Sequence, residues 1–124
     1  MPPAPVDPAR ITYYHAHVYF EDAESRAKAA ILREHLARAF PDARLGGWHD
    51  RQVGPHVLPM YQIAFSAGRM AEILPFLLLN RDGLTILVHP ETGNDYDDHV
   101  HHAAWLGRVL PLNAQVLRGA PGAA

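Results

Sequence analysis

The alternation of apolar and polar residues along the chain predicts a small protein of mixed strands and helices. Runs rich in β-branched and aromatic side chains, which favour strands, occur at residues 11–20, 44–50, 60–65 and 84–89. Two further segments repeat apolar side chains at helical spacing, which predicts helices at 21–40 and 69–80. Asp22 is placed to cap the first of these helices, and Pro41 is placed to end it.

The order of these elements is strand, helix, strand, strand, helix, strand. A third helix is expected at 95–107, followed by an extended segment at 111–117. This order predicts an α+β protein of the ferredoxin-like type, in which a four-stranded antiparallel sheet carries two helices on one face. In that topology the first and third strands are central, and the fourth lies beside the first. The opposite face is left for the C-terminal helix, a second subunit or a ligand cavity.

Proline-rich sequence marks both ends of the chain. Residues 1–10 are expected to form a disordered arm, and residues 118–124 a flexible tail. The segment between them, 11–117, shows no internal repeat and is long enough for one domain with its own core.

Strand alternation divides residues 11–20 into two faces, because successive side chains point to opposite sides of a sheet. One set is apolar and suits a core beneath the helices: Tyr14, Ala16, Val18 and Phe20. The other set points away from the helices: Tyr13, His15, His17 and Tyr19. The same alternation turns Gln62 and His89 toward this second face, and it is compatible with His49 there.

The chain holds nine histidines among its 124 residues, dispersed along the sequence and not gathered in a terminal tag. His15 and His17 project side by side from one strand, and His89 on a neighbouring strand can come within coordination range. Neutral imidazole is a ligand for Zn, Fe, Cu and Ni. The three histidines therefore form a candidate metal site, beside which no carboxylate has a clear place.

Other interpretations of the histidines stay open from the residues alone. A histidine pair on one strand is weak evidence, because most such residues are exposed or are hydrogen-bonded within a core. The histidine face also fits a dimer interface with satisfied imidazoles. His35 and His101 suit solvent-exposed positions, while His99 and His102, one helical turn apart, suit packing or capping on the last helix.

Composition excludes several classes of site. Without cysteine the chain has no disulfide and no thiolate metal ligand. A net charge of −2 with no cluster of Lys and Arg gives no reason to expect nucleic acid or an anionic membrane as partner. The first residues lack the features of a secretory signal, and no stretch approaches the roughly 20 apolar residues of a membrane span. We therefore expect a cytoplasmic protein.

Three blocks of sequence resemble the DOPA 4,5-dioxygenase family of fungi and bacteria. These blocks are HAHVYF, GGWHDRQVGPHVLPMYQIAF and LLLNRDGLTILVHPETGNDYDDHVHHAAWLG. The resemblance extends from Tyr13 to Leu117 and includes the spacing between blocks; it departs at Val100-His101 and in the N-terminal arm. The family's recurring histidines match His15, His17, His49, His56, His89, His99 and His102.

The resemblance implies a ferredoxin-like homodimer that cleaves a catechol ring in the extradiol manner with O₂ at non-haem Fe(II), giving a semialdehyde. Zn or another divalent metal is also compatible with the predicted ligands, His15, His17 and His89. His49 and His56 are the candidates for acid–base catalysis. The residues expected to line the substrate pocket are Tyr13, Tyr19, Trp48, Gln62 and His102. The alternative is a non-catalytic, dimeric module that binds a metal or a small molecule.

Overall fold

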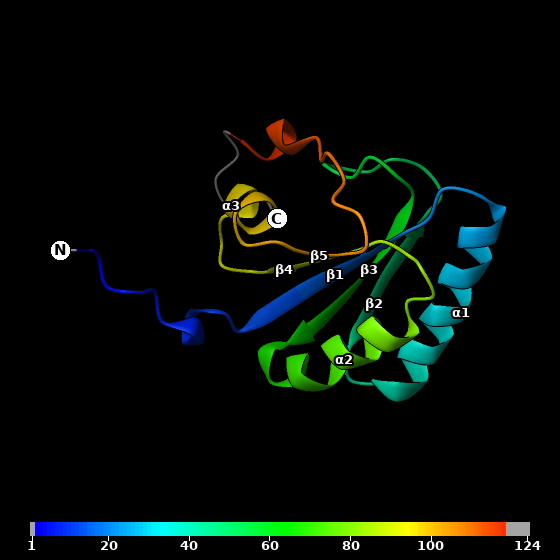
Figure 1. The fold of residues 1–124 in the computed structure, drawn as a ribbon, viewed down its shortest axis with the longest axis horizontal. Coiled ribbons are helices and arrows are strands. Elements are labelled where there is room, and N and C mark those ends of the chain that lie inside the picture. Colours follow the sequence, from blue (N-terminus) through cyan, green and yellow to red (C-terminus); the bar gives the residue numbers. More distant parts are fainter. Residues whose placement is uncertain (1, 119–124) are drawn as a thin grey trace.

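The computed structural model describes residues 2–118 and is built on a sheet of five antiparallel strands, in the order β2-β3-β1-β4-β5 (Figure 1). The strands are β1 (Tyr13–Tyr19), β2 (Arg44–His49), β3 (Met60–Ser66), β4 (Ile86–Pro90) and β5 (Ala104–Leu106). The α-helices are α1 (Ala23–Ala39), α2 (Met70–Asn80) and α3 (Asp95–Val100). The predicted α+β class is therefore confirmed.

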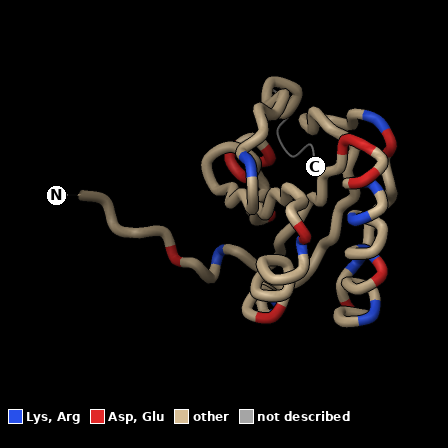
Figure 2. Tube along the Cα trace, turned by 45° about the vertical axis from the view of Figure 1, so that its right-hand side comes forward, with Lys and Arg blue, Asp and Glu red and all other residues tan. Residues whose placement is uncertain are grey.

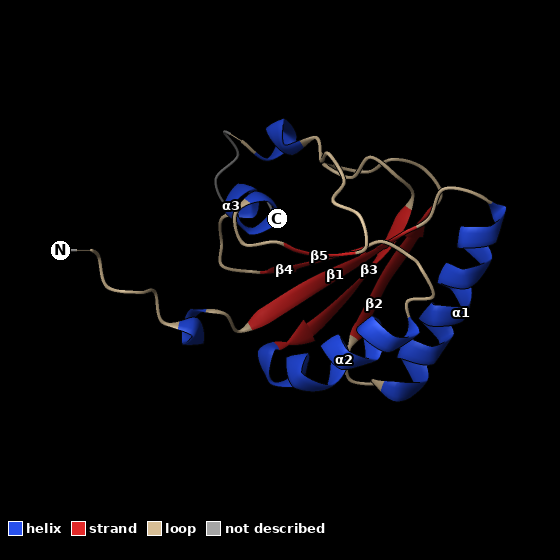
Figure 3. Ribbon diagram, viewed as in Figure 1, coloured by secondary structure: helices blue, strands red, loops and turns tan. Residues whose placement is uncertain are grey.

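The two long helices and the short one lie on opposite sides of the sheet. Helices α1 and α2 cover one face, whereas α3, the loop at 50–59 and the segment after β5 lie over the other (Figure 3). Strand β1 is central, between β3 and β4, as the sequence predicts. The most central strand thus carries His15 and His17.

The predicted number of four strands is wrong, and so is the third helix at 95–107. Helix α3 ends at Val100, and the residues after it turn back to form β5, where Trp105 lies opposite Leu87 of β4. Pairing with β5 satisfies backbone groups that β4 would otherwise expose along a sheet edge. The expected extended segment at 111–117 instead ends in a short 3₁₀ helix, Ala114–Leu117. Assignment to the ferredoxin-like class stays a prediction.

Helix α1 begins as the sequence predicts. The Asp22 side chain accepts a hydrogen bond from the backbone N–H of Ser25, and the Ser25 hydroxyl accepts one from the backbone N–H of Asp22. This reciprocal cap satisfies donors that a helix start leaves unpaired. The chain therefore turns sharply from β1 into α1, which fixes the end of the strand that carries the histidines.

Two apolar clusters lie on the two faces. The larger one, beneath α1 and α2, includes the predicted core residues Ala16, Val18 and Phe20. The smaller one, on the histidine side, consists of Tyr19, Met60, Leu87 and Leu110. The predicted alternation of β1 is therefore confirmed, and the face with the histidines is only partly apolar.

The N-terminal residues extend away from the body of the molecule (Figure 1). Residues 2–10 are exposed, and Pro8–Arg10 form one 3₁₀ turn that the Asp7 side chain caps. Disorder of this arm stays a prediction. The predicted flexible tail at 118–124 lies, apart from Arg118, outside the described residues.

On the Cα trace of Figure 2, positions of both charge signs alternate along α1, and acidic positions gather at α3. Within residues 2–118, none of the helices has both the length and the apolar character that a bilayer crossing requires.

Candidate metal centre

Five histidines meet on the face of the sheet that α1 and α2 leave free. His17 and His89 come from adjacent central strands, His56 from the loop at 50–59 and His99 from α3, and all four are at most 9% exposed. His15 completes the group at its rim, with a side chain that is 24% exposed. We call these five residues the histidine cluster.

The register of β1 against β4 brings three of these imidazoles together. His15 lies directly opposite His89, and His17 is two positions further along β1 on the same face. The Nε2 atoms of His17 and His89 are 3.0 Å apart. This confirms that β-strand alternation places His15, His17 and His89 on one surface, as the sequence predicts.

Two overlapping trios of histidines have ring nitrogens within 4.8 Å of one another. One trio is the predicted His15, His17 and His89, and the other is His17, His56 and His99. The ring centres of His89 and His99 are 3.9 Å apart, and those of His17 and His56 are 4.2 Å apart. Each trio has the donor number and the softness that a divalent transition metal accepts.

Three imidazoles are oriented by acceptors at Nδ1. The Nδ1 atom of His89 donates to the carbonyl of Pro90 at 2.9 Å, and that of His99 to the carbonyl of Asp95 at 2.8 Å. The Nδ1 atom of His15 lies 2.9 Å from a carboxylate oxygen of Glu91. Because a carbonyl only accepts, the proton of His89 and of His99 stays on Nδ1, and Nε2 carries the lone pair. Metal-binding histidines are held in this way in most proteins.

His17 has a nitrogen with no partner. Because the Nε2 atom of His89 carries a lone pair, His17 donates to it from its own Nε2, and its Nδ1 is left buried without a hydrogen bond. An unpaired buried acceptor is costly. The 3.0 Å between the two Nε2 atoms also suits neighbouring octahedral positions, since bonds of ~2.1 Å at a right angle put two nitrogens roughly 3.0 Å apart. The residues present therefore fit a metal ion.

Burial keeps these imidazoles neutral. Burial and, after it, the neighbouring His99 lower the pKa of His89 to about 3 and the pKa of His56 to about 4. The pKa of His17 lies well below its usual value, because of burial first and then of its histidine neighbours. Since the neutral ring is the form that binds metals, the cluster is ready to coordinate an ion near pH 7.

The sequence did not identify two members of this region. Glu91, expected at a turn, lies against His15, and burial together with the nearby Asp95 and Asp98 raises the pKa of Glu91 to about 7. His99, expected to pack or cap on the last helix, joins the cluster instead. The signal for Glu91 is its position two residues after His89, and that for His99 is its match to a recurring family histidine.

Several predicted site residues lie around the cluster. His49 lies at the end of β2, opposite Met60 on the histidine side, and its proximity contributes to the low pKa of His56. Gln62 is the β3 neighbour of His17, and Tyr13 is exposed at the start of β1. The hydroxyl of Tyr19 is 2.6 Å from Nδ1 of His56.

Trp48 and His102, which the sequence predicts to line the substrate pocket, are not close to the histidine cluster. Trp48 points to the helix face and stacks on Phe20 and Tyr61, with ring centres at 4.5 and 5.6 Å. The register of β2 changes between Leu45 and Trp48, yet alternation still separates Trp48 from His49. His102 is exposed in the turn after α3. Neither residue is brought to the cluster.

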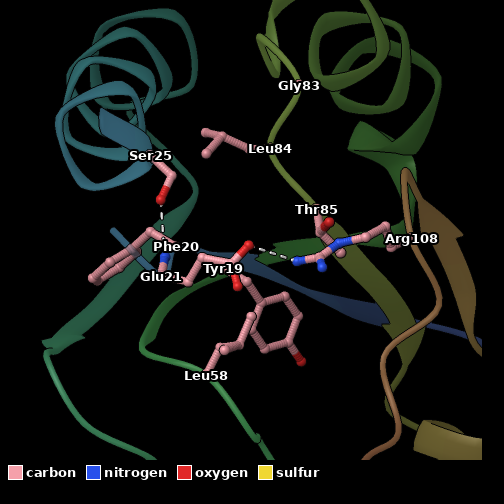
Figure 4. A pocket seen from close by; sticks show the side chains of 9 residues that line it. All are labelled: Tyr19, Phe20, Glu21, Ser25, Leu58, Gly83, Leu84, Thr85 and Arg108. Carbon is pink, nitrogen blue, oxygen red and sulfur yellow. Dashed lines mark hydrogen bonds and ion pairs between the residues drawn. The ribbon is translucent and has the colours of Figure 1, made fainter. Parts of the chain in front are cut away.

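A separate pocket of about 110 Å³ lies beyond the end of β1 (Figure 4). Arg108 and Glu21 close one side of it with a hydrogen bond of 2.9 Å, and the Ser25 hydroxyl accepts from the backbone N–H of Glu21. No histidine lines this pocket. Tyr19 forms part of its wall and reaches His56 with its hydroxyl, so this tyrosine separates the pocket from the cluster.

Known proteins resemble this chain over most of its length. A protein described as DOPA 4,5-dioxygenase from Amanita muscaria is 34% identical over an alignment of 112 residues, and the match covers 85% of this chain and 49% of that protein. An uncharacterized 21.2 kDa protein from Botryotinia fuckeliana is 30% identical over 92% of this chain and 68% of its own. This chain thus spans about half the length of the Amanita relative.

A solved structure is similar as well. The crystal structure of a proposed dioxygenase from Nostoc punctiforme is 47% identical, covers 92% of this chain and 97% of its own, and superposes with a TM-score of 0.89. The profile of the Dopa 4,5-dioxygenase family matches residues 14–116. The resemblance expected from the sequence motifs is confirmed: this chain belongs to the Dopa 4,5-dioxygenase family.

Proposed function

We propose that the protein is an Fe(II)-dependent dioxygenase that opens the ring of a catechol, such as DOPA, by extradiol cleavage with O₂. Family membership suggests a dioxygenase. The observation that supports the finer statement is the histidine cluster, in which the buried Nδ1 of His17 has no partner and the neighbouring His89 and His99 carry their lone pairs on Nε2. A bound cation would give this unpaired buried nitrogen a partner.

We assign the metal to His15, His17 and His89. His15 and His89 are oriented by partners at Nδ1. The third residue, His17, belongs to both trios of histidines. Fe(II) held there would supply the Lewis-acid and redox chemistry that the reaction of a catechol with O₂ requires. Zn or another divalent metal fits the same donors.

The chain itself does the remaining work. Burial of His17 and His89 keeps water from the inner side of the site, and Glu91 orients His15. We assign proton exchange with the bound diol to His49 and His56. Gln62 and Tyr13 lie on the more open side of the face and are the candidates to contact the aromatic substrate.

We also propose the ferredoxin-like class for the fold and a homodimer for the assembly. The strand order β2-β3-β1-β4, with α1 and α2 on one face, supports the first proposal. The homodimer rests on the resemblance alone.

An anaerobic Fe(II) titration followed by a catechol and air tests the function. We expect one equivalent of iron to bind and a yellow semialdehyde to form when DOPA and air are added. His17→Ala and His89→Ala should lose both iron binding and the yellow product. His35→Ala, an exposed histidine on α1, is the matched control and should retain both.

Two results would contradict the proposal. Iron binding without turnover of any catechol would favour the non-catalytic metal-binding module. Full activity in the variant that lacks both His17 and His89 would exclude the assigned ligands.

A further inference from the structure

The hydrogen bond between Tyr19 and His56 differs from the others around the histidine cluster. The Tyr19 hydroxyl lies 2.6 Å from Nδ1 of His56, and the two residues are 2% and 5% exposed. In His15, His89 and His99 the Nδ1 atom faces a carboxylate or a carbonyl oxygen. In His56, by contrast, Nδ1 faces a phenol hydroxyl, which carries a proton that it can donate.

The direction of this hydrogen bond follows from the partners that the Tyr19 hydroxyl has. Among residues 2–118 the Tyr19 hydroxyl has no second hydrogen-bond partner. If Nδ1–H of His56 donated to the phenol oxygen, the phenol hydrogen would be buried without an acceptor, which is unfavourable. If the phenol donates to Nδ1, the hydroxyl of Tyr19 and Nδ1 of His56 each have a hydrogen-bond partner. The proton of the neutral His56 ring is then on Nε2.

This tautomer determines what His56 can do. With Nδ1 accepting from the phenol and Nε2 carrying the proton, His56 has no free lone pair for a metal. His17 also carries its proton on Nε2, but its Nδ1 has no partner and keeps a free lone pair. His56 is a donor toward whatever lies beside it. The trio of His17, His56 and His99 thereby loses one of its ligands, whereas the trio of His15, His17 and His89 is unaffected.

The backbone around His56 is held independently of Tyr19. The backbone N–H of His56 donates to the carbonyl of Val53 at 3.0 Å, and that of Asn113 donates to the carbonyl of Pro55 at 2.8 Å. The side chain of Gln52 also donates to the carbonyl of Val57 at 2.8 Å. Loss of the Tyr19 hydroxyl should therefore change the protonation of the ring and leave the loop in place.

We propose that Tyr19 is a positioning residue that holds His56 with its proton on Nε2, so that His56 donates a hydrogen bond to an oxygen of the bound aromatic diol. The statement about the diol rests on the proposed function, whereas the tautomer does not. Tyr19 then acts through His56 and does not itself line the substrate pocket.

Histidine-selective ¹⁵N NMR of the metal-free protein tests the tautomer directly. We expect His56, assigned by comparison with His56→Gln, to show an unprotonated Nδ1 and a protonated Nε2. Tyr19→Phe should lose this pattern. Tyr61→Phe is the matched control, because it removes a hydroxyl that is equally buried but donates to the carbonyl of Ala29 on the helix face. A protonated Nδ1 in the unaltered protein, or an unchanged spectrum in Tyr19→Phe, would overturn the proposal.

Kinetics of the iron-loaded protein test the consequence. Tyr19→Phe should lower kcat by about tenfold or more, since an oriented proton donor contributes roughly 10²–10⁴-fold, with KM and iron content unchanged. Adding Tyr19→Phe to His56→Gln should cause no further loss, because the two residues act as one unit. Iron loss in His56→Gln would make His56 a ligand and refute the assignment. If the unaltered protein cleaves no catechol, the proposed function fails, while the NMR spectrum still decides the tautomer.

Discussion

The two faces of the sheet are built on opposite principles. Beneath α1 and α2, apolar side chains such as Ile63 and Leu36 are fully buried against one another. On the other face, imidazoles occupy buried positions of the same central strands, and one of their nitrogens has no partner. The first face stabilises the fold by removing apolar surface from water. The second gives up part of that stability and keeps donors in place for a ligand.

The largest expected difference between the faces appears in acid. The pKa values of His89 and His56 are about 3 and about 4 in the folded protein, against 6.5 when unfolded. Below pH 6.5 these two histidines therefore bind more protons in the unfolded chain than in the folded one, so their contribution to stability is complete above that pH and falls as the pH is lowered. At about 1.4 kcal/mol per proton and pH unit, the two rings together should cost the metal-free protein about 4–5 kcal/mol between pH 6.5 and 4.5. The raised pKa of Glu91, about 7, acts in the opposite direction and offsets part of this loss.

Urea unfolding of the metal-free protein over this pH range measures that loss. His56→Gln should reduce the slope by about one proton, because one of the titrating rings is gone. A stability that does not change between pH 6.5 and 4.5 would mean that the rings are not buried in the neutral form.

A smaller effect is expected when the polar pair of the histidine face is made apolar. His89→Leu alone leaves both nitrogens of His17 unpaired and should destabilise the metal-free protein by about 1–3 kcal/mol. His17→Leu/His89→Leu removes the unpaired groups together and should be more stable than either single variant. Chemical denaturation of the three variants gives the coupling energy.

The helix face provides the control for this cycle. Ile63→Ala, in the fully buried core, should cost about 2–5 kcal/mol with no such recovery. If the losses of stability in the two single histidine variants simply add in the double variant, the unpaired nitrogens do not destabilise the metal-free protein as we expect.

The smallest effect is expected at the rim of the cluster. Glu91→Gln removes the negative charge beside Nδ1 of His15 and should weaken iron binding by about tenfold, the lower end for such partners, because His15 is partly exposed. Anaerobic competition with a chelator measures the change. Glu24→Gln, whose carboxylate is 81% exposed and pairs with Lys28, should bind iron as the unaltered protein does.

Local patterns explain why part of the site could be predicted. The two-residue period of a strand places His15, His17 and His89 on one face whatever the rest of the chain does. The helix-side core of β1 follows from the same rule. Along β2 the register changes between Leu45 and Trp48, yet alternation still separates Trp48 from His49. The expectation that Trp48 lines the substrate pocket does not follow from the strand period.

The remaining features depend on contacts between distant segments. Helical spacing continues past Val100, but pairing of β5 with β4 ends the helix and is not encoded in that spacing. The position of His99 depends on how α3 lies over the sheet, and that of Glu91 on the direction the chain takes after Pro90. No local sequence pattern predicts how α3 lies over the sheet or where the chain runs after Pro90.

Strand β5 has a consequence for the time scale on which the site stays assembled. Its three residues cover the outer edge of β4 next to His89, so part of the strand that bears this histidine lies between two neighbours instead of fraying into solvent. Amide hydrogens of such interior strands exchange with solvent only through large openings of the structure. A segment too short to contribute much core therefore slows local unfolding beneath the imidazoles, and the geometry of the cluster persists for as long as this part of the sheet stays closed.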